Sequence, residues 1–285
     1  MLLAVPNVSE GRDPVAVAEI ADAFAAGGAE LLDIHSDPDH NRSVLTLKGA
    51  PGMLSHALLA GAREATDRID LNEHDGVHPH VGALDVAPVV HLSGATRGAA
   101  CAEALVAADL IATELAIPVF LYGALAGGRT RADLRRGGPA QLARRLNAGE
   151  LRPDFGPPQL HPTAGATLVA ARPPLVAFNV ELRPPATKAD AMGIAAGIRE
   201  SGPTGLPGVR AIGLELAARG GVAQVSLNIE DHERAALADV VAAIAKHAAI
   251  AETELVGLAP ASAFDGFPDD IPVRNRRTIE EAVGS

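Results

Sequence analysis

Three of the ten histidines in this 285-residue chain lie within one short segment, at His74, His78 and His80. Imidazole takes up and releases a proton near neutral pH, so this segment could carry acid–base catalysis. Asp75 and Asp85 lie close by in the sequence. The segment falls between a predicted helix and a predicted strand, where functional groups are commonly mounted on a rigid frame. This combination favours a functional loop over an ordinary polar one.

The His-x-His spacing leaves a second interpretation open, a metal-dependent hydrolase that uses His78 and His80. Alternate residues of a strand point to the same side and can share one zinc or iron ion. Pro79 lies between the two histidines, however, and the strand is expected to begin later. The remaining ligands would have to be His35, His40 or Asp85. Our preferred interpretation therefore contains no metal site.

A basic run lies in the middle of a chain whose formal net charge is −11. It consists of Arg129, Arg131, Arg135, Arg136, Arg144, Arg145 and Arg152. Guanidinium groups suit carboxylates, so the run indicates a small anionic ligand, although a solvated helix face would have the same composition.

Polar side chains also follow the first predicted strand, at Asn7, Ser9, Glu10 and Arg12. The end of a strand is where α/β proteins place ligand contacts, but Glu10 could simply favour the start of the next helix. No G-x-G-x-x-G or G-x-x-x-x-G-K-[ST] pattern is present, so the sequence shows no nucleotide-binding motif.

Composition narrows the class of protein. Aromatic residues make up 2% of the chain, which together with the negative charge argues against nucleic-acid binding. The single cysteine, Cys101, excludes a disulfide within the chain and a zinc site built on cysteines. The N-terminus lacks a basic signal-peptide region, and no apolar run approaches the length of a membrane span. We expect a cytoplasmic α/β enzyme with no membrane or nucleic-acid partner.

Two stretches of the sequence predict the same element order, β-α-β-β-α-β. In the first, strands are expected at residues 2–6, 30–35, 43–48 and 83–90, with helices at 14–26 and 52–69. In the second, strands are expected at 175–182, 209–215, 222–229 and 253–258, with helices at 188–200 and 232–247. A helix at 98–115 and a strand at 118–121 lie between them.

This repeated pattern predicts an α+β (α/β) protein of two ferredoxin-like subdomains, residues 1–173 and 174–285, with a substrate cleft or tunnel between them. The alternative is one doubly wound sheet, against which the adjacent strand pairs count. The proline-rich segment 153–158 is expected to form a rigid wall near the boundary. Residues from 265 onward are expected to form a surface tail.

Ten segments of the sequence, in register, resemble the formiminotransferase family. The first half contributes Val5-Pro6-Asn7-Val8-Ser9-Glu10-Gly11-Arg12, Asp39-His40-Asn41-Arg42-Ser43-Val44, His78-Pro79-x-Val81-Gly82-Ala83-Leu84-Asp85-Val86, Leu121-Tyr122-Gly123, Arg131-x-x-Leu134-Arg135-Arg136-Gly137 and Pro153-Asp154-Phe155-Gly156-Pro157. The second half contributes Phe178-Asn179-Val180-x-Leu182, Ile198-Arg199-Glu200-Ser201-Gly202, Gln224-Val225-Ser226 and Glu254-Leu255-Val256-Gly257-Leu258.

The resemblance implies a glutamate formimidoyltransferase, which moves the formimino group of N-formimino-L-glutamate to N5 of tetrahydrofolate in histidine degradation. Tetrahydrofolate would be a co-substrate, and a stand-alone enzyme without a cyclodeaminase domain is expected. A homodimer is the default expectation for its assembly. A non-catalytic folate-binding module is a further alternative.

By the same resemblance His78 is the catalytic histidine, and residues 153–165 line the folate site. Asp39 or Asp85 could orient the His78 ring. The residues expected to bind substrate or folate are Asn7, Ser9, Arg12, His40, Asn41, His80, Gly82, Asp85, Asp154, Phe155, Gly156, Pro157 and Gly165. The chain departs from the family at His80, where arginine is frequent, and in lacking an aromatic residue shortly after Pro157.

Overall fold

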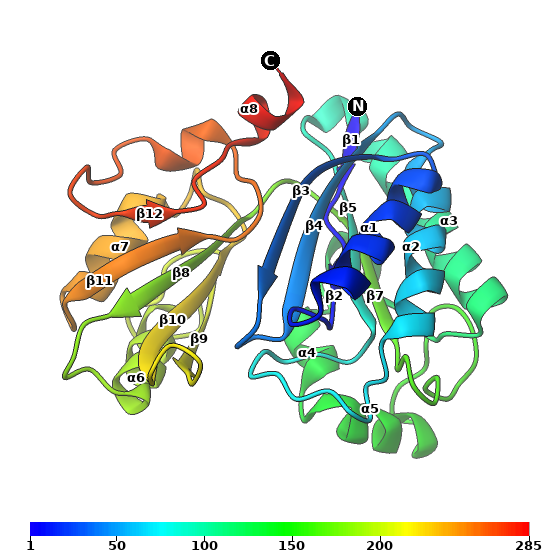
Figure 1. The fold of residues 1–285 in the computed structure, drawn as a ribbon, viewed down its shortest axis with the longest axis horizontal. Helices are drawn as coiled ribbons and strands as arrows, with labels where there is room; N and C mark the ends of the chain where they lie inside the picture. The colour runs from blue at the N-terminus through cyan, green and yellow to red at the C-terminus, as the bar shows by residue number, and fades with distance from the viewer. Residues whose placement is uncertain (285) are drawn as a thin grey trace. The chain divides into compact units, whose positions relative to one another are not determined.

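Short apolar runs within the first 173 residues form a seven-stranded sheet (Figure 1). The computed structural model describes residues 1–284 and divides into two units, Met1–Pro173 and Pro174–Ser285. The strands of the first unit are β1 (Leu2–Ala4), β2 (Asn7–Val8), β3 (Glu30–Asp37), β4 (Arg42–Gly49), β5 (Leu84–Val90), β6 (Val119–Leu121) and β7 (Thr167–Arg172).

Strands β1 and β2 together occupy one place in this sheet, between β4 and β5, and are antiparallel to both. Pro6 lies between them and cannot donate a hydrogen bond, which divides the single strand predicted for residues 2–6 into two. Strand β3 pairs with the outer side of β4, while β7 and then β6 continue the sheet parallel to β5. The end of β2 and the starts of β4 and β5 are therefore neighbours.

Helices cover both faces of the sheet. On one face lie α1 (Pro14–Ala26), α2 (Leu54–Arg68) and α3 (Arg97–Leu115), whose buried side chains share a core with those of β4 and β5. Asp13 caps α1 by accepting hydrogen bonds from Val15 and Ala16. On the other face lie α4 (Arg131–Arg135) and α5 (Gly138–Asn147), which form a smaller core with β6 and β7.

The second unit contains a five-stranded sheet in the order β12-β11-β8-β10-β9. Its strands are β8 (Val176–Leu182), β9 (Val209–Leu216), β10 (Val222–Ile229), β11 (Ile250–Leu255) and β12 (Val273–Arg274), and its helices are α6 (Lys188–Ile198), α7 (Leu237–Ala245) and α8 (Ile279–Val283). The core takes every second residue of β8, namely Phe178, Val180 and Leu182, as expected for a sheet with one apolar face.

The structure confirms the mixed α/β class and the two β-α-β-β-α-β segments, and it contradicts the alternative of one doubly wound sheet. Besides the division of the first strand, three local expectations differ. Strand β7 was not expected, because its run is short and lies between proline-rich segments. Helix α7 begins at Leu237, five residues later than expected.

The third difference is the segment after residue 265, expected to be a surface tail. It adds β12 in parallel to β11, packs Phe267, Ile271 and Val273 against the core of the second unit, and buries Ile279. Among residues 1–284, no helix combines the length and the apolar character needed to cross a bilayer.

Candidate active site

A carboxylate with no solvent exposure lies at the start of β5. Asp85 is 0% exposed, and its Oδ2 atom accepts hydrogen bonds from Arg42 at 2.8 Å and from Arg135, while Oδ1 accepts from the backbone N–H of Val81 at 2.9 Å. Burial alone would raise the pKa of Asp85, but Arg135 and Arg42 outweigh it, so the pKa lies below its ordinary value. Asp85 is therefore a buried anion held by two cations.

Arg42, the first residue of β4, is the centre of the network. Its side chain donates through Nε to Asn7 Oδ1 at 3.0 Å, and its Nη1 atom lies near both Asp85 and Nδ1 of His78, 3.3 Å from the latter. Asn7 is itself held by a hydrogen bond to the carbonyl of Val5. Burial lowers the pKa of Arg42 to about 10, against the opposing effect of Asp85, so Arg42 is positively charged at neutral pH.

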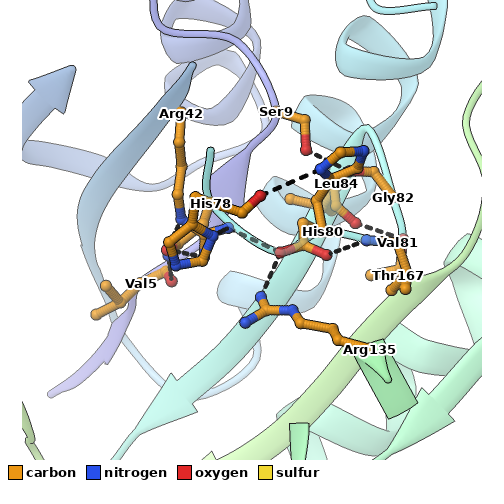
Figure 2. A network of polar contacts seen from close by, with 12 residues as sticks. Val5, Ser9, Arg42, His78, His80, Val81, Gly82, Leu84, Arg135 and Thr167 are labelled. Atoms are coloured by element: carbon orange, nitrogen blue, oxygen red, sulfur yellow. Dashed lines mark hydrogen bonds and ion pairs between the residues drawn. The ribbon is translucent and has the colours of Figure 1, made fainter. Parts of the chain in front are cut away.

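His78 faces this network from the histidine-rich loop (Figure 2). Burial, and then the charges of Arg42 and Arg135, lower its pKa well below the ordinary value of 6.5. The ring of His40 lies beside it, with 5.8 Å between the ring centroids. His78 is therefore a neutral imidazole at physiological pH, which is the form able to accept a proton.

The other two histidines of the loop pack against each other. The rings of His74 and His80 meet edge to face, with 4.3 Å between their centroids. His80 Nδ1 lies 3.3 Å from the carbonyl oxygen of His78. Asn41 contacts His74 Nδ1 at 3.2 Å. Burial and the neighbouring His80 lower the pKa of His74. These contacts shape the loop around His78.

Arg12 and Ser9 fasten the same loop to the first strand and helix. Arg12 forms an ion pair with Asp75 and donates to the carbonyl of Pro38 at 2.9 Å. Ser9 donates to the carbonyl of Gly82 at 2.8 Å. Both residues were expected to bind substrate, and in this structure their polar groups hold the loop.

Two glycines bring the end of this loop against the segment before β7. Gly82 and Gly165 form an isolated antiparallel bridge. A Cβ atom at Gly82 would lie 1.9 Å from the carbonyl oxygen of Ala166, and Gly165 has a φ of +69°, which disfavours other residues. Asn72 also donates to the carbonyl of Pro162, at 3.1 Å. Residues 162–165 therefore lie beside the histidine-rich loop.

The motif at residues 153–157 lies elsewhere, at the edge strand β6. Asp154 accepts a hydrogen bond from Leu121 N–H at 2.8 Å and pairs with Arg129, while Phe155 bridges Val119. Gly156 adopts a φ of +83°, and Pro157 follows it partly buried. Strand β7 separates this edge from β5. The structure thus groups Asn7, His40, Asn41, His80, Gly82 and Asp85 with His78, but places Asp154, Phe155 and Gly156 beside β6.

Sequence reasoning did not select Arg42 as a site residue, and placed Arg135 only within a general basic run. A detectable signal was available, because Asp85 lies within an apolar strand and a buried carboxylate requires buried donors. Within the described part of the chain, no group of three or more His, Cys, Asp or Glu side chains could hold a metal ion.

The fold and site define a two-unit α/β protein in which a neutral histidine lies beside buried arginines, an arrangement suited to proton transfer near an anionic ligand. Residues 1–172 match the family model described as the formiminotransferase domain, N-terminal subdomain, and residues 177–266 match the formiminotransferase domain. The chain belongs to the formiminotransferase family.

Curated relatives agree with this assignment. The chain is 37% identical over 269 residues to a glutamate formimidoyltransferase of Streptococcus pyogenes serotype M1, covering 91% of this chain and 89% of the relative. It is 35% identical over 276 residues to a glutamate formimidoyltransferase of Thermoplasma acidophilum, covering 91% and 88%. A formimidoyltransferase-cyclodeaminase of Sus scrofa is 38% identical over 276 residues, and the chain spans 50% of that protein's length.

Proposed function

We propose that this protein is a glutamate formimidoyltransferase that moves the formimino group of N-formimino-L-glutamate to N5 of tetrahydrofolate and releases glutamate. The observation that carries the proposal is the placement of His78 beside Arg42 and His40, where burial and the arginines lower its pKa, in a chain of the formiminotransferase family. His78 is the proposed catalytic residue.

The chemistry needs one proton to move between two nitrogens. N5 of tetrahydrofolate attacks the formimino carbon, and a tetrahedral intermediate forms in which that carbon bonds both N5 and the glutamate nitrogen. The bond to the glutamate nitrogen then breaks, and that nitrogen leaves as an amine. The proton lost by N5 is the proton gained by the leaving nitrogen, and His78 is placed in the proposal as its carrier.

The charges around His78 suit the carboxylates of both substrates. Arg42 and Arg135 share the single carboxylate of Asp85, which leaves a surplus of positive charge in the buried network. Arg131 lies one helical turn before Arg135, with its guanidinium 5.7 Å from the centre of the Tyr122 ring. Guanidinium groups bind carboxylates through paired hydrogen bonds, so these arginines are the proposed anchors for glutamate groups.

Residues 158–165 are the proposed folate-side wall. Their last residues lie beside the histidine-rich loop, since Leu71 N–H donates to the carbonyl of Thr163 at 2.9 Å and Gly165 bridges Gly82. The earlier part of the motif, Asp154 to Gly156, is assigned instead to holding this segment against β6.

The test mixes the purified protein with formiminoglutamate and tetrahydrofolate, acidifies the sample and measures the absorbance of 5,10-methenyl-tetrahydrofolate. We expect product with the unaltered protein and a loss of product with His78→Gln. Folate binding without product would favour a binding module. Release of glutamate without 5,10-methenyl-tetrahydrofolate, lost on chelation and restored by a divalent metal, would favour the metal-dependent hydrolase.

A further inference from the structure

The contact between Arg42 and His78 involves a group that can only donate. A guanidinium carries N–H groups and has no acceptor, whatever its surroundings. Arg42 Nη1 lies 3.3 Å from His78 Nδ1 and is buried, so at this contact Nδ1 must be the acceptor. A neutral imidazole has one ring proton, which must then reside on Nε2.

We propose that Arg42 is a positioning residue that fixes the resting tautomer of His78 with its proton on Nε2. This inference concerns the protein without substrate, and only its catalytic consequence rests on the proposed function. The neutral state of the ring supports it, because burial and the adjacent arginines lower the pKa of His78.

The consequence is a restriction on when His78 can act as a base. Its Nε2 begins as a donor, and it can accept a proton there only after the contact at Nδ1 has been exchanged for another. Arg42 Nη1 lies 2.8 Å from Asp85 and 3.3 Å from His78, so the contact with His78 is the longer of the two. An anionic group that accepts the Nη1 hydrogen now directed at His78 would therefore release Nδ1, and the other Nη1 hydrogen would keep its contact with Asp85.

Several charged or titratable groups face His78, and among residues 1–284 the contact that the structure records at Nδ1 is the one made by Arg42. Arg42 approaches from β4, Arg135 from α4 and His40 from the turn before β4, while Asp85 acts through the two arginines. Arg135 thus resembles Arg42 in charge and in its ion pair with Asp85, but it makes no hydrogen bond to the ring that the structure records. It is the matched control.

The experiment is a long-range proton–nitrogen NMR correlation of the imidazole groups in the full chain without substrate, at neutral pH. His78→Gln identifies the His78 signals. We expect an unprotonated Nδ1 and a protonated Nε2 in the unaltered protein. Reversed nitrogens, or shifts averaged between the two tautomers, would overturn the proposal.

Variants then separate the effect of the hydrogen bond to His78 Nδ1 from the effect of a nearby positive charge. Arg42→Met should weaken the preference for the Nε2-protonated form by about tenfold, the effect of losing one hydrogen bond from a charged donor. Arg135→Met should raise the pKa of His78 but leave its tautomer unchanged. Arg42→Lys keeps a charged donor and should retain the Nε2-protonated tautomer. Equal effects of Arg42→Met and Arg135→Met would contradict the assignment. If Arg42→Met does not fold, as judged by circular dichroism, the unaltered protein and Arg42→Lys decide the question.

Discussion

Arg42 Nη1 lies 2.8 Å from Asp85 Oδ2, and this ion pair joins the first residue of strand β4 to the start of β5 across the intervening strand β2. Both side chains are nearly excluded from solvent, at 8% and 0% exposure. Removing one partner of such a pair leaves an uncompensated buried charge, which costs far more than the pair itself contributes.

Asp85→Asn should therefore destabilise the protein strongly. The substitution keeps the shape but leaves Arg42 and Arg135 buried without a counter-charge, and we expect a loss of about 3–5 kcal/mol in the free energy of unfolding. Chemical denaturation measures this loss. Glu30→Gln is the control, because the Glu30 side chain is 61% exposed in its ion pair with Lys48, and its loss should be below about 1 kcal/mol. Equal losses for both variants would contradict the role given to Asp85.

The stability of the protein should fall in acid because of the same residue. The pKa of Asp85 in the folded protein lies below its ordinary value, so the ionised form stabilises the fold above that ordinary value. This contribution is lost as the pH falls below about 4 and through the folded-state pKa. Unfolding curves against pH should show a steeper decline for the unaltered protein than for Asp85→Asn. Parallel curves would mean that Asp85 does not titrate in this way.

His78→Gln should abolish most activity while leaving the fold intact. If His78 carries the proton, kcat should fall by about 10²–10⁴-fold, the usual contribution of a positioned acid–base group. His56→Gln on the exposed face of α2 is the control and should change nothing. Steady-state kinetics and thermal unfolding of both variants provide the comparison, and near-normal turnover in His78→Gln would remove this residue from the mechanism.

Glu103 should stabilise helix α2 from its neighbour α3. The buried Glu103 carboxylate accepts hydrogen bonds from the backbone N–H groups of Gly52 and Ser55, at the start of α2, where unpaired donors need an acceptor. Glu103→Gln should lower the free energy of unfolding by about 1–2 kcal/mol. Glu114 lies on the exposed side of α3, the helix that carries Glu103. Glu114→Gln should leave the free energy of unfolding almost unchanged.

Gly82→Ala should disrupt the junction between the histidine-rich loop and residues 162–166. The new Cβ would lie 1.9 Å from the Ala166 carbonyl oxygen, so the backbone has to move. We expect a lower melting temperature and a weaker folate affinity. Gly94→Ala is matched to it, since a Cβ atom at Gly94 would meet nothing within 4 Å. An unchanged melting temperature in Gly82→Ala would show that the junction is pliable.

The fold was largely predictable because periodicity and caps agree along most of the chain. Asp13 and Pro14 mark the start of α1, and the alternation of Phe178, Val180 and Leu182 marks β8, so local chemistry and the tertiary structure favour the same elements. Strand β7 has parallel neighbours on both sides and shows the nearly continuous apolar run typical of such a strand, but the proline-rich segments around it led to its being missed.

The site was predictable in part. The clustering of histidines indicated the loop as a candidate site, and the resemblance to the formiminotransferase family implied His78 as its catalytic residue, which stays a prediction. The role of Arg42 depends on the pairing of β2 with both β4 and β5, which brings together residues far apart in the sequence. The same pairing explains why Arg12 and Ser9, chosen as ligand contacts, are engaged by the loop itself.

The insertion of β2 between β4 and β5 has a consequence for the kinetics of folding. The network joins Asn7 to Arg42, Arg42 to Asp85 and Asp85 to Arg135, over separations of 35, 43 and 50 residues. Contacts of such long range form slowly, because the entropy of closing the loops is lost before the contacts can compensate for it. During synthesis, a chain that extends only to the end of β5 contains Asp85 and Arg42 but lacks Arg135, the second counter-ion of this carboxylate. We expect catalytic competence to arrive last, with the docking of α4, so that recovery of activity during refolding reports the completion of the whole first unit.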